Sequence, residues 1–203
     1  MIVFVQMPYA AIEHPSIALG LLQAECKQNG LSVRTLYPNL QWREWLGQEA
    51  YGTISSGLSE DLVGEWTFSQ AAFNWTSERE EDYLQMVCSR GVLASRPGVK
   101  ELLARAREEA HKFIEKTALE VLSLGPKIVG ASSTFQQHCA SLALLRKLKS
   151  LDPEIVTVMG GANCEGIMGV TLARHCNWVD YIVSGEADKL AVPLFTSILE
   201  GQP

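Results

Sequence analysis

The feature of this sequence that most restricts its fold is a repeated alternation between short apolar runs and longer segments with helical periodicity. The first apolar run, residues 2–7 (IVFVQM), is nearly continuous, as in parallel strands that are covered on both faces. A helix is predicted next, because Ser16 is a suitable N-cap and Asn29-Gly30 a suitable stop. A second strand is predicted in LSVRTLYPN, so the chain opens with a strand–helix–strand unit whose crossover should be right-handed.

The first predicted helix has an apolar face that we expect to pack on the sheet. Helical spacing places Ile17, Leu21 and Ala24 on that face, and Ala18 and Leu22 lie beside them. These five residues are therefore the predicted contact between this helix and the strands.

The same alternation returns after the breaker Gly125-Pro126. Strands are predicted in KIVGASST, EIVTVMGG and VDYIVSGE, and helices in QQHCASLALLRKLKS, GIMGVTLARHC and DKLAVPLFTSILEG. Leu142, Leu145 and Leu148 are in step along the first of these helices. Regular alternation of strand and helix predicts an α/β fold with a doubly wound parallel sheet of about five strands.

An interruption of about residues 40–99 separates the two halves and is too long for a plain loop. It carries four of the five tryptophans, namely Trp42, Trp45, Trp66 and Trp75, and their rings need burial. We therefore expect short helices that form a lid or subdomain beside the sheet edge. A helix over 100–124 then returns the chain to the sheet.

Composition excludes several classes of function. The net charge is −6 and no basic block is present, which argues against a nucleic-acid partner. No apolar stretch approaches the roughly 20 residues of a membrane helix, so no membrane partner is expected. The five cysteines form no CxxC pair, so we expect neither a disulfide framework nor a zinc site, but reduced thiols in a cytoplasmic protein.

The carboxyl ends of the predicted strands are small or polar, and ligands of open parallel sheets bind at that edge. Adjacent glycines at 160 and 161 allow close approach to the backbone, and Ser132, Ser133 and Thr134 offer hydroxyl groups. These residues predict a pocket for a ligand with phosphate or amide arms, although turn geometry alone also explains paired glycines. The spacing of a dinucleotide-binding glycine loop and that of an ATP-binding loop are both absent.

The ordered segments GASSTF, VTVMGGANCEG and VDYIVSGEAD resemble the cobalamin-binding domain that precedes the catalytic barrel in B12-dependent radical SAM enzymes. The double glycine followed by D-Y-x-V-x-G-E is the most specific part of this resemblance. The N-terminal segment HPSIALGLLQAECKQNGLSVRTLYPNLQWREWLGQEAY, with GEWTF and EEDYL, is similar to radical SAM C-methyltransferases of RiPP and bacteriocin maturation. The resemblance covers nearly the whole chain.

The resemblance implies a Rossmann-like, flavodoxin-like domain over residues 1–203 that holds cobalamin above the carboxyl edge of its sheet. In such enzymes, cobalamin passes a methyl group from S-adenosylmethionine to a ribosomally made peptide. The implied partners are the radical SAM barrel and the precursor peptide. The implied cofactor-binding residues are Gln6, Pro8, His14, Ser16, Ser132, Ser133, Thr134, Phe135, Gly160, Gly161, Ala162, Asn163, Ser184, Gly185 and Glu186.

Two departures from the family pattern limit what the chain alone is expected to do. The D-x-H-x-x-G motif that supplies a lower cobalt ligand is absent, although His14 lies in the corresponding loop. The C-x-x-x-C-x-x-C signature for the 4Fe-4S cluster is also absent, and such a cluster needs converging thiolates. We therefore expect S-adenosylmethionine and the cluster to bind in a barrel outside this chain, and the chain to be inactive alone.

Alternatives to cobalamin binding remain open on the sequence. One alternative is a degenerate module without cobalamin that docks a substrate peptide or the barrel. The other is a flavodoxin-like enzyme that uses a nucleotide. If they do not contact a ligand, His14 is a loop histidine, His138 is a capping residue, and Cys164 is a structural thiol. Glu186 either contacts a ligand or braces its loop, and the acidic segment SEREEDY is read as a solvated helix face.

Overall fold

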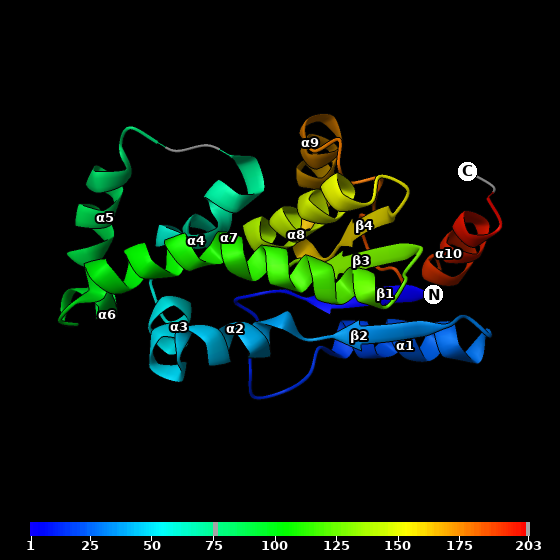
Figure 1. Cartoon of the computed structure of the whole chain (residues 1–203), viewed down its shortest axis with the longest axis horizontal. Coiled ribbons are helices and arrows are strands. Elements are labelled where there is room, and N and C mark those ends of the chain that lie inside the picture. Colours follow the sequence, from blue (N-terminus) through cyan, green and yellow to red (C-terminus); the bar gives the residue numbers. More distant parts are fainter. Residues whose placement is uncertain (75–76, 202–203) are drawn as a thin grey trace.

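The computed structural model describes residues 1–74 and 77–201 (Figure 1). Trp75, one of the four tryptophans in the interruption, lies outside the described residues. The five strands are all parallel and lie in the order β2-β1-β3-β4-β5, which confirms the predicted doubly wound sheet. Their bounds are β1 Ile2–Gln6, β2 Val33–Leu36, β3 Ile128–Ser132, β4 Val156–Gly160 and β5 Tyr181–Ile182.

Helices cover both faces of the sheet, and each strand sends alternate side chains to the two faces. In β1, β3 and β4, even-numbered residues such as Phe4 and Val158 pack with α1 and α10, whereas odd-numbered residues such as Val5 and Met159 pack with α7 and α8. The helices around the sheet are α1 Ile17–Gln28, α7 Val99–Ser123, α8 His138–Leu151, α9 Gly166–His175 and α10 Ala191–Leu199.

The predicted capping of the first helix is confirmed, but its predicted inner face is wrong. Ser16 accepts a hydrogen bond from the Leu19 N–H at 3.2 Å, and the helix ends at Gln28. The residues that α1 buries are Leu19 and Cys26, whereas Ile17 is 77% exposed and Leu21 is 58% exposed. The reason is that the side of α1 carrying Ile17 and Leu21 faces a groove between α1 and α10.

The interruption is helical, as predicted, and its helices share the main core of the sheet. They gather beyond the carboxyl ends of the strands, at the end of the molecule away from the N-terminus and α10 (Figure 1). Helix α4 packs against α7 and α8. The elements are α2 Pro38–Leu46, α3 Gln48–Ser55, η1 Ser59–Asp61, α4 Val63–Phe73, α5 Glu80–Cys88 and α6 Gly91–Ala94.

Aromatic packing explains why this interruption does not form a separate lid. Trp42 is fully buried, and its ring centroid lies 5.2 Å from that of Phe68 and 4.8 Å from that of Phe113. Phe113 belongs to α7, and the same hydrophobic cluster contains Val3 and Val5 of β1. The added helices therefore extend the core that covers one face of the sheet.

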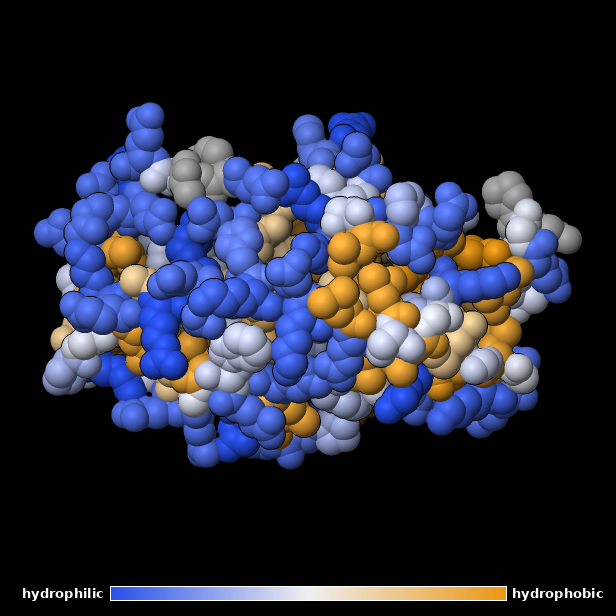
Figure 2. All heavy atoms as spheres, in the orientation of Figure 1, coloured by the Kyte–Doolittle hydropathy of each residue, from blue (hydrophilic) through white to orange (hydrophobic). Residues whose placement is uncertain are grey.

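The surface is uneven in character. Figure 2 shows that apolar residues gather on the half of the visible face nearer to the N-terminus and α10, whereas the surface over α5 and α6 is largely hydrophilic. The acidic segment contributes to this hydrophilic end, although Glu80 pairs with the buried Arg107 at 2.8 Å. The prediction of a solvated face for this segment therefore needs correction at Glu80.

We predict that Trp42→Ala lowers the free energy of unfolding by about 3–5 kcal/mol, because it leaves a large cavity between α2, α4 and α7. Urea unfolding followed by far-UV circular dichroism measures the change. Leu119→Ala on the outer side of α7, where Leu119 is 56% exposed, is the control and should change stability by less than about 0.5 kcal/mol. Equal effects of the two substitutions would contradict the assignment of Trp42 to the core.

Candidate functional site

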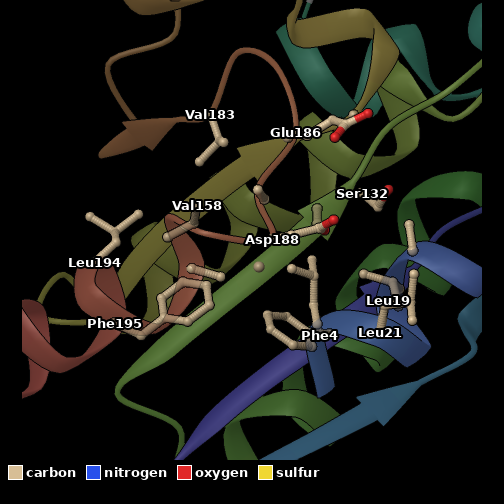
Figure 3. A pocket seen from close by; sticks show the side chains of 18 of the residues that line it. Phe4, Leu19, Leu21, Ser132, Val158, Val183, Glu186, Asp188, Leu194 and Phe195 are labelled. Carbon is tan, nitrogen blue, oxygen red and sulfur yellow. The ribbon is translucent and has the colours of Figure 1, made fainter. Parts of the chain in front are cut away.

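A groove of about 500 Å³ lies between α1 and α10 on one face of the sheet (Figure 3). This volume is within the usual range for sites that bind small molecules. Side chains of α1 and α10 form its two walls, and β1, β3 and β4 form its floor. Its lining includes Phe4, Ile17, Ala18, Leu19, Leu21, Leu22, Val158, Val183, Leu194 and Phe195.

The two ends of the groove differ in polarity. The oxygen atoms of Ser132, Glu186 and Asp188 lie toward one end in Figure 3, whereas Leu194 and Phe195 lie toward the other. Among the described residues that line the groove, none is a lysine, an arginine or a histidine. The groove therefore suits a ligand with a flat apolar part and neutral hydrogen-bonding arms, and it disfavours a phosphate-rich nucleotide.

Small residues in the floor give the groove its depth. A Cβ atom at Gly130 would lie 2.9 Å from Cδ1 of Phe4, so glycine lets this ring lie across the strand. The Phe4 ring centroid is 5.7 Å from that of Phe195 on α10. At Gly160 a Cβ atom would meet nothing closer than Cβ of Val183 at 3.6 Å, and the missing side chain leaves open space in the groove.

The second glycine of the pair has a different role from the first. Gly161 has φ +95, and a Cβ atom there would lie 2.5 Å from the Ser133 carbonyl oxygen. This residue must be glycine for two reasons, since the backbone is left-handed and the loop after β3 is in contact with it. Gly160 therefore opens the groove, and Gly161 allows two loops to pack together.

Three predicted site residues hold these loops together instead of facing the groove. The Asn163 side chain donates hydrogen bonds to Ser133 Oγ at 3.0 Å and to the Thr134 carbonyl at 2.5 Å. Ser133 is fully buried, and its N–H donates to the Gly160 carbonyl at 2.8 Å. His138 Nδ1 lies 3.3 Å from Ser133 Oγ, and burial lowers the pKa of His138.

Gln6 carries a buried polar atom near the carboxyl edge of the sheet. In the parallel register Gln6 pairs with Ser132, and Ser132 pairs with Gly160, so the three residues form one row across the carboxyl edge. Alternation along β1 places the Gln6 side chain on the same face as Phe4, which is the face of the groove. Its Oε1 atom is buried and has no hydrogen-bond partner among the described residues. Other buried atoms in the described part of the chain, such as Trp42 Nε1 and Asn39 Oδ1, also lack a partner, so Gln6 Oε1 is an available acceptor but does not by itself mark a ligand site.

The other predicted residues fall into two groups. Gly185 and Glu186 line the groove together with Ser132, Gly160 and Gly161. His14 lies apart from them, on a separate cavity of about 210 Å³ with Tyr37 and Asn39. The structure therefore places no predicted histidine in the groove.

The remaining five lie around the rim or within the scaffold, and one of them, Ser16, is the N-cap of α1. Pro8 is buried beyond β1, and Phe135 is 49% exposed on the loop after β3. Ala162 begins the short helix η2, Ala162–Cys164. Ser184 accepts a hydrogen bond from the Gly166 N–H at 2.9 Å, which ties the loop after β5 to the start of α9.

Sequence reasoning missed the part of the interruption that fixes the loop after β3. Glu65 on α4 accepts hydrogen bonds from the His138 N–H at 3.0 Å and from the Cys139 N–H at 2.6 Å, so it caps α8 from another helix. Gln136 accepts a hydrogen bond from the Gly64 N–H at 2.5 Å. No local pattern signals a cap that comes from residues more than 70 positions away.

Sequence reasoning also missed the α10 wall of the groove, including Leu194 and Phe195. The sequence of α10 (AVPLFTSIL) did contain a signal for this wall, because apolar residues occupy almost every side of the helix. A helix with such composition needs more than one apolar contact.

The described residues offer neither a reactive cysteine nor a cluster of metal ligands at the groove. Burial raises the pKa of Cys164 to about 11, so this residue is a structural thiol. All five cysteines are free. Within residues 1–74 and 77–201, no group of three or more histidine, cysteine, aspartate or glutamate side chains could hold a metal ion. None of the helices in these residues is both long and apolar enough to cross a membrane.

Comparisons with known proteins give one distant similarity. Over 83 residues the chain is 29% identical to the anaerobic magnesium-protoporphyrin IX monomethyl ester cyclase of Rubrivivax gelatinosus. The aligned part is 41% of this chain and 15% of that protein, so the chain spans a small fraction of this relative. No family model matches the chain, and no solved structure matches it.

We predict that alanine destabilises the protein more at Gly161 than at Gly160. Gly161→Ala should lower the free energy of unfolding by about 2 kcal/mol or more, because it combines a left-handed backbone with a clash against Ser133. Gly160→Ala should lower it by less than about 1 kcal/mol, because its Cβ meets only ordinary contacts. Chemical denaturation of both variants checks this, and a greater loss of stability in Gly160→Ala would contradict the roles assigned to the pair.

Proposed function

We propose that this chain is a cobalamin-binding module of a B12-dependent radical SAM enzyme. The observation that carries the proposal is the groove between α1 and α10, which is apolar inside and is lined at the carboxyl edge by Ser132 and Gly160. The distant similarity to the anaerobic magnesium-protoporphyrin IX monomethyl ester cyclase supports a cobalamin-binding module and nothing finer. The resemblance of GASSTF, GGANCEG and YIVSGEAD to cobalamin domains points in the same direction.

The residues present fit the group that the proposal requires. Cobalamin has a nucleotide tail with an aromatic base, and amide arms around its ring. The apolar walls of α1 and α10 would enclose the tail and exclude water from it. The unpaired Oε1 of Gln6 and the hydroxyl of Ser132 would hydrogen-bond to amide arms, and the carboxylate of Glu186 would accept from an amide N–H.

Bound cobalamin would supply methyl transfer, with S-adenosylmethionine as the source of the methyl group. The part of this chain is to hold and orient the cofactor. Since His14, the histidine of the loop after β1, lies on a separate cavity with Tyr37 and Asn39, we propose that the protein binds cobalamin without a histidine ligand to cobalt. The proposed substrate, by resemblance to maturation C-methyltransferases, is a ribosomally made peptide, and the proposed partner is a radical SAM barrel.

A second candidate function is that of a docking module without cobalamin. The start of α9 and the loop after β3 carry exposed apolar side chains at the carboxyl edge, where Ile167 is 75% exposed and Phe135 is 49% exposed. Such side chains would suit contact with a neighbouring barrel or a peptide. The corrin ring would also lie on this edge, so only a binding measurement separates the two functions.

We predict that the purified chain retains hydroxocobalamin after desalting, with the absorbance spectrum of a cofactor whose own base is detached from cobalt. A spectrum with a coordinated base would contradict the placement of the tail in the groove. Absence of retained colour, in a protein that is folded by circular dichroism, would favour the docking module.

The matched variants Ala18→Trp and Ala24→Trp add the same side chain to exposed positions of α1. Ala18 lines the groove and Ala24 does not. Ala18→Trp should weaken cobalamin binding at least about tenfold by filling the groove, whereas Ala24→Trp should bind as the wild type does.

A further inference from the structure

We infer that the groove selects corrinoids by the polarity of the lower base, and that it takes an apolar base such as dimethylbenzimidazole in preference to a purine. This inference rests on the proposed function, because it concerns the part of cobalamin that would enter the groove. It assigns base selectivity to the inner walls of the groove.

The inner end of the groove offers no hydrogen-bonding side chain. Its described lining consists of Phe4, Val158, Val183, Leu194 and Phe195, and each of the five is at most partly exposed. Their oxygen and nitrogen atoms belong to the backbone, and the Val183 N–H donates to the Met159 carbonyl at 2.9 Å. A base that enters here would meet apolar side chains only.

The polar groups of the groove lie at the other end. Ser132, Glu186 and Asp188 gather near the carboxyl edge (Figure 3), and the unpaired Oε1 of Gln6 belongs to the same row as Ser132. These groups match the amide arms of the corrin ring. They lie on the side of the groove away from Leu194 and Phe195 (Figure 3).

This arrangement distinguishes two classes of base. The methyl groups and fused ring of dimethylbenzimidazole need no partner in an apolar cavity. Adenine has an exocyclic amino group and additional ring nitrogen atoms that lose their hydrogen bonds to water on entry. An apolar pocket rejects a polar analogue of similar shape by about tenfold to a hundredfold.

The test compares dissociation constants of the whole chain for three corrinoids, measured by quenching of tryptophan fluorescence and by equilibrium dialysis. The probes are hydroxocobalamin, the adenine-containing pseudocobalamin, and cobinamide, which lacks the nucleotide. We expect hydroxocobalamin to bind at least about tenfold more tightly than either of the others.

Two variants of the same type of substitution test the residue assignment. Val158→Thr adds one hydroxyl group inside the groove without a change of shape, and it should reduce the preference for hydroxocobalamin over pseudocobalamin several-fold. Val192→Thr adds the same group on α10 outside the groove lining, and it should leave the preference unchanged.

Each contrary outcome has a distinct meaning. Equal or tighter binding of pseudocobalamin overturns the base selectivity and leaves the proposed cobalamin module in place. Equal binding of cobinamide shows that the nucleotide stays outside the groove, which also overturns the inference but not cobalamin binding. Failure of all three corrinoids to bind overturns the inference and the proposed function together.

Discussion

Close backbone contact between the loops after β3 and β4 is the constraint on which the candidate site depends. Gly161 lies against Ser133 so closely that a Cβ atom would be 2.5 Å from the Ser133 carbonyl oxygen. The contact brings Asn163 within hydrogen-bonding distance of Ser133 and Thr134. Since these loops hold the carboxyl edge in place, Ser132 and Gly160 form one preformed edge of the groove, and Gln6 lies beside Ser132 in the sheet.

Helix α4 strengthens the same edge from the side of the interruption. Glu65 caps α8, and the Gln136 side chain accepts a hydrogen bond from the Gly64 N–H. The added helices therefore fix the loop after β3 at two points. Burial raises the pKa of Glu65, while the two N–H groups of α8 act in the opposite direction. The tryptophan-rich helices thus support the loops through one shared core, and the face that carries α1 and α10 stays open for a ligand.

Much of the fold could be predicted from the sequence, because local patterns determine it. Continuous apolar runs marked the parallel strands, and Ser16 and Asn29-Gly30 marked the ends of α1 correctly. The buried face of α1 could not be read in this way, since Ile17 and Leu21 are apolar for a reason other than core packing: they line a groove. Periodicity cannot distinguish a side chain that covers the sheet from one that covers a ligand.

The predicted site residues do not all lie together in the structure, and the groove has a wall that the sequence did not indicate. Strand ends indicated Ser132, Gly160, Gly161, Gly185 and Glu186, all of which line the groove. His14 was also expected there, and the structure places it on another cavity, because the loop after β1 is drawn toward the start of α2 by the hydrogen bond from Asn39 to the Ala11 carbonyl. The α10 wall and the Glu65 cap depend on contacts between distant segments, which no local pattern reports.

The measurement that tests the central claim most directly is hydrogen–deuterium exchange of the whole chain with and without hydroxocobalamin, analysed by mass spectrometry. A cofactor whose tail enters the groove should slow exchange in α1, α10 and the loops that follow β1, β3, β4 and β5, and should leave α5 and α6 unchanged. Unchanged exchange in α1 and α10, or protection confined to the tryptophan-rich helices, would contradict the assignment of the groove as the cobalamin site.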